Sequence, residues 1–298
     1  MRRTLLRTLV SAAAAASVAA LAAPQRVLVT GANKGIGKAI CRKLLESRSD
    51  VEVLLGARDG GRGAAAVAEL GAEYGADRVR LVEIDTASDA SVASAAATVA
   101  AAFPDEAAPL YGLVNNAGIG FGKGFDATLE TNYKGPRRVT ENFRPMVTSR
   151  ICNIASASGP NFVERCGIPA QKALLSDPLS ASLADVEALG DSYLGTTDYD
   201  NCAYGVSKAL LNAYTALYAR HEEHSGLIVT SCSPGYIKTD LTAGMGATNP
   251  PEKGAVAPCF CLFGDARPGY YYGSDAVRSP IAWYRGPGEP AYEGGTER

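Results

Sequence analysis

Residues 27–37 read Val-Leu-Val-Thr-Gly-Ala-Asn-Lys-Gly-Ile-Gly, a short apolar run that leads into a turn punctuated by three glycines. The apolar run predicts a buried strand, and a helical pattern continues to residue 48. Glycines permit a tight turn and let its backbone approach a pyrophosphate at the positive end of the helix. A plain strand-to-helix turn is the alternative. The candidate nucleotide contacts in this stretch are Gly31, Asn33, Lys34, Gly35, Ile36 and Gly37.

The strand-to-helix order repeats along the chain. Short apolar runs predict strands at 27–30, 51–55, 79–84, 110–115, 151–154 and 227–232, and longer stretches predict helices at 35–48, 61–74, 89–103, 126–143 and 204–223. Alternating strands and helices are typical of an α/β fold. We therefore predict a Rossmann-type doubly wound parallel sheet with helices on both faces, formed by residues 25–298 as a single domain.

Two stretches interrupt this alternation. The first is a polar insertion at about 160–201 with a helical pattern at 183–189, and the second is a Gly-, Thr- and Pro-rich loop at 234–254. Both follow predicted strands, and open α/β sheets bind ligands beyond the carboxyl ends of their strands. These stretches are therefore candidates for the wall of a substrate site. The tail from residue 269 is predicted to add a final strand.

Composition excludes several classes of protein. The 298 residues carry a formal net charge of −2, with acidic and basic residues interspersed, so we do not expect nucleic acid as a partner. The seven cysteines are odd in number and scattered without Cys-x-x-Cys spacing, and the chain has only two histidines. This pattern predicts reduced thiols and no metal site.

Residues 1–24 have the composition of a targeting segment. Arg2, Arg3 and Arg7 precede an alanine-rich run, and no acidic residue occurs before Glu46. A basic, acid-free start predicts an organellar transit peptide for a plastid or mitochondrion, and a secretory signal is the alternative. Reduced cysteines favour the organelle. The apolar run is too short and too weakly apolar to predict a stable membrane span.

The end of the second predicted strand bears on the choice of cofactor. NAD enzymes carry an acidic residue there for the ribose 2′-hydroxyl, but this chain has Gly56-Ala57-Arg58. Arg58, together with Lys34, offers positive charge to a 2′-phosphate, which favours NADPH and NADP+ over NADH. The alternative is that both are ordinary surface cations.

Polar residues also follow the third and fourth predicted strands. Asp85 and Thr86 follow the third, and Asn115, Ala117 and Gly118 belong to the turn after the fourth. These residues are candidate contacts of the adenine and of the rest of the cofactor. Asx residues also bond their own backbone in turns, and that alternative stays open.

Tyr204 and Lys208 are a candidate pair for proton transfer. Residues at positions i and i+4 share one face of a helix, so the ammonium can lie close to the phenol. A fixed positive charge lowers the pKa of a tyrosine from its usual value near 10, which would suit a general acid or base. Apolar residues of the same segment fall on the opposite face, where they can pack. The alternative is that both residues simply lie on a solvated helix face and have no catalytic function.

Several of these motifs resemble the short-chain dehydrogenases/reductases. Their order is Thr30-Gly-x-x-x-Gly35-x-Gly37, Asn115-Asn-Ala-Gly118, a serine after the fifth strand, Tyr204-x-x-x-Lys208 and Ser233-Pro-Gly235. Within that superfamily the chain is most similar to the carbonyl reductase and menthone reductase group. The additional shared features are Ala57-Arg58-Asp59, the segments 113–119 and 130–133, and the long insertion before Tyr204.

The resemblance implies roles for further residues. Tyr204 corresponds to the general acid and Lys208 to the residue that lowers its pKa and binds the nicotinamide ribose. Ser156 corresponds to the serine that holds the substrate carbonyl, with Ser158 as its rival, and Asn132 to an asparagine that anchors a water bridge to the lysine. The remaining expected cofactor contacts are Pro234, Gly235, Ile237 and Thr239.

The chain departs from the family pattern at one position of the active-site serine pair, where Ala155 replaces the first serine. The long insertion resembles one that covers the surface other members use to oligomerise, so the resemblance implies a monomer. The expected activity is NADPH-dependent reduction of a small-molecule ketone, aldehyde or quinone. The alternatives are a catalytically idle NADPH-binding, redox-responsive protein and an NADP-dependent alcohol dehydrogenase that acts oxidatively.

Overall fold

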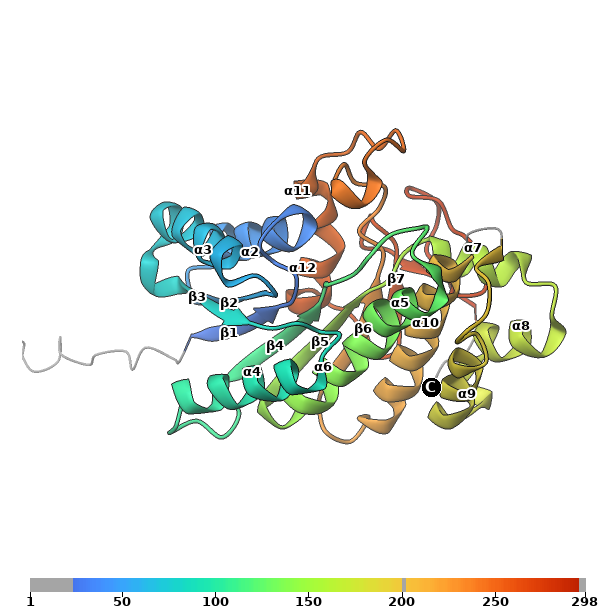
Figure 1. The fold of residues 1–298 in the computed structure, drawn as a ribbon, viewed down its shortest axis with the longest axis horizontal. Helices are drawn as coiled ribbons and strands as arrows, with labels where there is room; N and C mark the ends of the chain where they lie inside the picture. Colours follow the sequence, from blue (N-terminus) through green and yellow to red (C-terminus); the bar gives the residue numbers. More distant parts are fainter. Residues whose placement is uncertain (1–23, 200–201, 295–298) are drawn as a thin grey trace, which may run out of the picture.

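In the computed structural model, which describes residues 24–199 and 202–294, eight strands form one sheet in the order β3-β2-β1-β4-β5-β6-β7-β8 (Figure 1). The strands are β1 Gln25–Val29, β2 Val51–Ala57, β3 Val79–Glu83, β4 Leu110–Asn115, β5 Val147–Ile154, β6 Ile228–Cys232, β7 Tyr271–Tyr272 and β8 Arg278–Ser279. All neighbouring pairs are parallel except β7 with β8. The predicted doubly wound sheet is confirmed, and the tail does add strand structure at the sheet edge.

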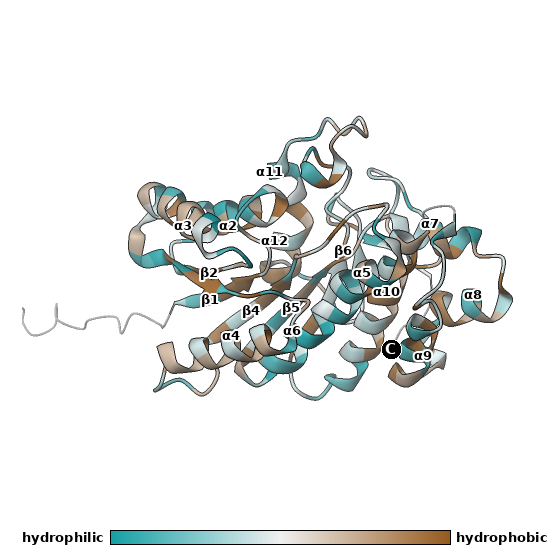
Figure 2. Ribbon diagram, viewed as in Figure 1, coloured by the Kyte–Doolittle hydropathy of each residue, from teal (hydrophilic) through white to brown (hydrophobic). Residues whose placement is uncertain are grey.

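Helices cover both faces of the sheet. The helices α2 Gly35–Ser47, α3 Gly60–Tyr74 and α12 Val256–Phe263 lie on one face, and α4 Asp89–Ala102, α6 Gly135–Phe143 and α10 Ala203–His221 lie on the other (Figure 1). Side chains of β1 alternate between the two cores, with Val27 and Val29 on the α2 side and Leu28 on the α10 side. Parallel strands need both faces covered, which explains the apolar band through the middle of the molecule (Figure 2).

The segment predicted as one helix over 126–143 is divided into three parts. They are α5 Gly124–Leu129, the π-helical segment η2 Glu130–Lys134 and α6. Pro136 lies at the start of α6, and because proline has no backbone N–H it cannot extend the regular hydrogen-bond ladder from the preceding turn. Widened turns of this kind are frequent at functional sites, and this one contains Asn132.

The insertion is helical and packs against α10. It forms α7 Ser158–Arg165, α8 Pro169–Ser176 and α9 Leu183–Asp191, the last of which begins with a capping box between Ser182 and Asp185. Together with the sheet and α5, these helices bury α10 on nearly every side. α10 is therefore buried beyond the one face that its apolar stripe predicted, because the insertion supplies a second packing surface.

The predicted targeting segment lies, up to residue 23, outside the described residues. No helix in the described part of the chain has the length and apolar character needed to span a bilayer.

Candidate active site

A cleft of about 680 Å³ lies where six parallel strands end. Its lining comes from the loops that follow β1 to β6, the position at which open α/β sheets bind ligands. All of the residues predicted for catalysis and cofactor binding line this cleft except Asn115 and Asn132. The fold thus brings together side chains that are up to about two hundred positions apart in the sequence.

The glycine turn is shaped by close backbone packing. Gly31 and Gly35 have φ angles of +64° and +55°, which residues other than glycine rarely adopt. A Cβ atom on Gly37 would lie 2.5 Å from both the Asn116 side-chain nitrogen and the Gly31 carbonyl oxygen. The turn can therefore accept only glycine at these positions without rearrangement.

The end of β4 holds the glycine turn in place. The Asn116 side-chain amide donates to the carbonyl oxygens of Thr30 at 2.8 Å and Gly31 at 3.2 Å. In return, the Thr30 hydroxyl accepts hydrogen bonds from the backbone N–H groups of Asn116 and Ala117. Sequence reasoning did not single out Asn116, although it lies between two residues that were named.

The side chain of Asn115, a predicted cofactor contact, does not lie in the cleft. Its side chain is buried and donates to the Thr140 hydroxyl at 3.0 Å and to the Asn153 side-chain oxygen at 2.8 Å, so it belongs to a polar network in the core and not to the cleft. The reason is the alternation of side chains at a strand end, which directs Asn115 and Asn116 to opposite sides. Of the two adjacent asparagines, Asn116 lines the cleft and Asn115 does not.

The start of α2 has the properties of an anion site. Lys34 at its N-cap makes no capping hydrogen bond through its side chain, and the first turn contains no acidic residue. The N–H groups of that turn and the positive end of the helix dipole therefore face the cleft uncompensated. Because the backbone there carries only glycine and isoleucine, a diphosphate can approach it closely, which fits a dinucleotide cofactor.

Among the basic side chains that line the cleft, Lys34, Arg58 and Arg62 come from the segments that follow β1 and β2. The Lys34 ammonium lies 2.6 Å from an Asp240 carboxylate oxygen, and Arg62 lies 3.2 Å from Asp59, so both already have an acidic partner. Arg58 has none among the described residues. Arg58 is thus the uncompensated charge at the position predicted for a 2′-phosphate.

Ser156, Tyr204 and Lys208 lie at the opposite end of the cleft from Arg58, after β5 and on the first two turns of α10. The Ser156 hydroxyl accepts the backbone N–H of Ser158 at 3.1 Å and donates to the Ser158 hydroxyl at 3.3 Å. The Lys208 ammonium is buried, donates to the Ile154 carbonyl oxygen at 2.7 Å and lies 5.7 Å from the centre of the Tyr204 ring. Ser156 and Ser158, the two serines considered for binding the substrate carbonyl, both line the cleft.

The electrostatics of Tyr204 differ from the prediction. Burial raises the pKa of the Tyr204 phenol above its usual value, and a hydrogen bond with Ser156 lowers the pKa by a smaller amount. Lys208 does not lower the pKa of Tyr204 because its ammonium is directed at the Ile154 carbonyl and not at the phenol. The phenol consequently stays protonated at neutral pH, which is the form that can donate a proton.

Asn132 lies behind the cleft and not in it. Its side chain accepts the N–H of Ile119 at 2.8 Å and donates to the Ile119 carbonyl oxygen at 2.9 Å, and it also reaches the Ser207 hydroxyl at 3.3 Å. These contacts tie the turn after β4 to the helix residue that precedes Lys208. In this structure Asn132 is a positioning residue that joins two walls of the cleft.

One residue of the catalytic end was missed by sequence reasoning. Phe121, from the loop after β4, is 40% exposed, and the centroid of its ring lies 4.5 Å from the centroid of the Tyr204 ring. No local pattern marks Phe121, because only the fold brings that loop to the start of α10. Arg62 was also missed, although it could have been noticed as a cation four positions after Arg58.

Lys208 should make the stability of the protein depend on pH. Burial lowers the pKa of Lys208 from 10.5 to about 8, so between these values the unfolded chain binds more protons than the folded protein. Stability should therefore rise with pH over that interval, by on the order of 3 kcal/mol. We expect the difference in unfolding free energy between Lys208→Met and the wild type to shrink from pH 7 to pH 10, measured by urea unfolding. A difference that does not change with pH would contradict the burial of a charged lysine.

A second cavity, of about 520 Å³, adjoins the catalytic end of the cleft. It lies among α7, the start of α8 and the start of α10, and it shares Phe121 and Ser158 with the main cleft. The insertion therefore does form a wall beside the predicted catalytic residues, as expected from its place after β5.

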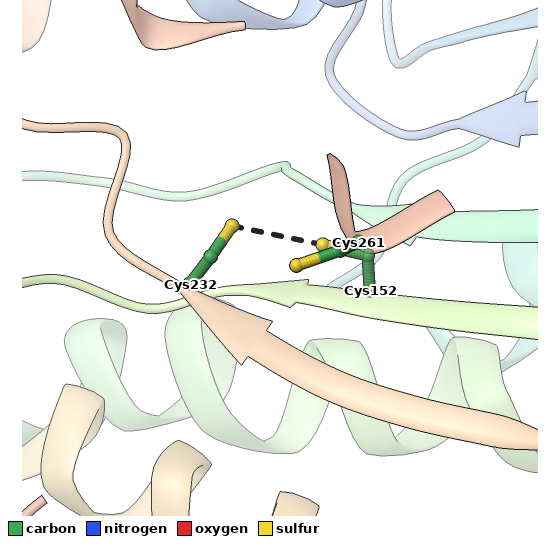
Figure 3. A group of neighbouring side chains, drawn as sticks. All are labelled: Cys152, Cys232 and Cys261. Carbon is green, nitrogen blue, oxygen red and sulfur yellow. Dashed lines mark hydrogen bonds between the residues drawn. The ribbon is translucent and has the colours of Figure 1, made fainter. Parts of the chain in front are cut away.

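Three of the scattered cysteines meet in the core beside the sheet. The sulfur atoms of Cys152, Cys232 and Cys261 all lie within 4.8 Å of one another (Figure 3). Burial raises the pKa of the Cys232 thiol, and no fourth histidine, cysteine or carboxylate joins the group within the described ranges. Structural zinc sites have four protein ligands, and catalytic ones have three and a water. The absence of a metal stays a prediction, and metal analysis of the purified protein would test it.

Comparisons with known proteins agree with this geometry. Residues 25–169 match the short chain dehydrogenase family. The chain is 32% identical over 259 residues to NADPH carbonyl reductase 1 from Mus musculus, covering 78% of this chain and 88% of that protein. It is 34% identical over 257 residues to NADPH carbonyl reductase 3 from Mus musculus, with the same coverage of 78% and 88%.

Solved structures show the same fold. Salutaridine reductase from Papaver somniferum has a TM-score of 0.72 at 25% identity, covering 83% of this chain and 99% of that one. Menthone neomenthol reductase from Mentha piperita has a TM-score of 0.68 at 25% identity, covering 85% of this chain and 99% of that one.

Proposed function

Because this chain belongs to the short-chain dehydrogenase family of oxidoreductases, we propose that it is an NADPH-dependent carbonyl reductase that acts on a small ketone, aldehyde or quinone. The observation that carries the proposal is one continuous cleft with two different ends. The glycine turn and Arg58 lie at one end, and Ser156, Tyr204 and Lys208 lie at the other. This arrangement suits a dinucleotide that lies along the cleft and a carbonyl group bound at the catalytic end.

Bound NADPH would supply the hydride, and the residues of the chain supply the rest. The hydroxyl groups of Ser156 and Tyr204 would donate hydrogen bonds to the carbonyl oxygen as negative charge develops on it. Tyr204 would then give its proton to that oxygen. The Lys208 ammonium would stabilise the phenolate left behind, once binding draws it from the Ile154 carbonyl towards the ribose.

The names of relatives support the cofactor and the substrate class. The two similar proteins from Mus musculus are named as NADPH carbonyl reductases. Arg58 supports the same cofactor, because it lies without an acidic partner in the described chain where a 2′-phosphate would be bound. The raised pKa of Tyr204 keeps the phenol protonated, which is the form in which carbonyl reduction must begin.

The proposal is tested by measuring NADPH oxidation with a panel of ketones, aldehydes and quinones, and by repeating the panel with NADH. Protein without residues 1–24 is suitable. We expect turnover of at least one carbonyl class with a preference for NADPH. Binding of NADPH without turnover of any compound would favour the idle, redox-responsive alternative. Faster oxidation of alcohols by NADP+ than reduction of the matching carbonyls would favour the alcohol dehydrogenase.

We also propose that the protein is a monomer and that residues 1–24 direct it to a plastid or mitochondrion. The insertion covers α10, the surface by which a pair of chains could otherwise associate. Light scattering of the purified protein tests the first proposal, and a species of twice the chain mass would contradict it. A fluorescent fusion of residues 1–24 tests the second, with secretion as the contrary outcome.

A further inference from the structure

The second cavity is placed to receive the part of a substrate that extends away from the carbonyl group. It opens directly onto the catalytic end, since Ser158 and Phe121 belong to both cavities and Phe121 contacts the Tyr204 ring. Gly205, the neighbour of Tyr204, also lines it. A compound whose carbonyl oxygen meets Tyr204 can therefore continue into this space.

One face of α7 forms the length of the cavity. Ser158, Asn161, Phe162 and Arg165 all line it, and their spacing of i, i+3, i+4 and i+7 places them on a single helical face. The seven steps from Ser158 to Arg165 correspond to roughly 10 Å along the helix axis. Arg165 therefore marks the far end of the cavity, and Ser158 marks the catalytic end.

Large apolar side chains line part of the cavity although they are exposed. Phe121, Ile168 and Tyr199 line it and are 40%, 49% and 51% exposed, although they come from three separate segments. Scattered apolar residues at a surface are ordinary, but a cluster around a concave space is typical of a ligand site. Together with Phe162, these side chains suit an aromatic group.

Among the residues that the structure describes, Arg165 is the only charged one in the lining of the second cavity. No carboxylate of the described residues forms an ion pair with it. The nearest basic neighbour in sequence, Lys172, donates instead to the Glu164 carbonyl oxygen at 2.7 Å and does not line the cavity. A guanidinium without an ion-pair partner at the end of a cavity lined by aromatic rings can bind a carboxylate.

We propose that the second cavity binds aromatic carbonyl compounds that carry a carboxylate, with the carbonyl at Tyr204 and the carboxylate at Arg165. The inference rests on the proposed function and adds the substrate class. The aromatic body would pack between Phe121 and Phe162, and the two polar ends would be held within roughly 10 Å of each other.

Calorimetric binding of 4-(4-acetylphenyl)butanoate, whose ring lies between the ketone and the carboxylate, and of its methyl ester, both in the presence of NADP+, tests the inference. NADP+ cannot donate a hydride, so the experiment measures binding alone. We expect the acid to bind the wild type about tenfold more tightly than the ester, as for a partly exposed charge-assisted hydrogen bond. Arg165→Met should abolish that preference without changing the affinity for the ester, and Arg165→Lys should keep part of it.

Lys172→Met is the matched control, because it removes a basic side chain from the next helix without altering the cavity, and it should leave both affinities unchanged. Equal affinities of the wild type for acid and ester, or equal weakening of both by Arg165→Met, would overturn the inference. Reduction of the ester by NADPH is a separate measurement. If NADPH reduces neither compound of this pair nor any of the carbonyl panel while the acid still binds through Arg165, the proposed function fails and the binding site stands.

Discussion

Tyr204→Phe is expected to lower kcat for every accepted carbonyl substrate about a thousandfold, the size of effect typical of a positioned general acid. The change removes the phenolic hydroxyl and keeps the ring that packs against Phe121. Lys208 and its bond to Ile154 are also kept, so NADPH should bind as it does to the wild type. NADPH oxidation gives kcat, and a fluorescence titration gives the dissociation constant of NADPH.

Tyr214→Phe is the matched control for Tyr204→Phe. Tyr214 is on the same helix but is buried in the core and does not line the cleft. Its replacement should leave kcat unchanged. Normal turnover of all substrates by Tyr204→Phe would show that the proton comes from elsewhere, and the proposed mechanism would be wrong.

Arg58→Asp is expected to weaken the binding of NADPH about a hundredfold and to leave the binding of NADH equal or improved. A hydrogen bond to a charged group contributes about 1.5–3 kcal/mol, and the new carboxylate would in addition repel the 2′-phosphate. A carboxylate at this position is also what NAD enzymes use to bind the ribose 2′-hydroxyl. Titration of the variant with each reduced cofactor measures both effects.

Arg62→Met provides the comparison for Arg58→Asp. Arg62 lines the same part of the cleft, but its guanidinium already lies 3.2 Å from the Asp59 carboxylate, so its removal should weaken NADPH binding less. Equal losses of NADPH and NADH affinity in Arg58→Asp would contradict a specific role at the 2′-phosphate.

Much of the fold could be predicted because the information is local. The apolar runs that became β1 to β6 are short and bounded by glycine or polar residues, and each is a strand near its predicted position. The break in the helix over 126–143 was not predicted, because a π turn depends on how Asn132 and Pro136 are accommodated against the neighbouring turn and helix. The burial of α10 was also missed, since it depends on where the insertion packs.

The sequence by itself determined the order of the motifs, the doubly wound sheet, and the residue types that line the cleft, because these depend on local propensity and on spacing within single elements. Tertiary structure alone decided which of Asn115 and Asn116 reaches the cleft, because strand ends direct adjacent side chains to opposite sides. It also decided the raised pKa of Tyr204, because burial is a property of the surrounding helices and not of the pair itself. Tertiary structure also decided that Arg165 lies in the second cavity, since segments distant in the sequence form the walls of that cavity.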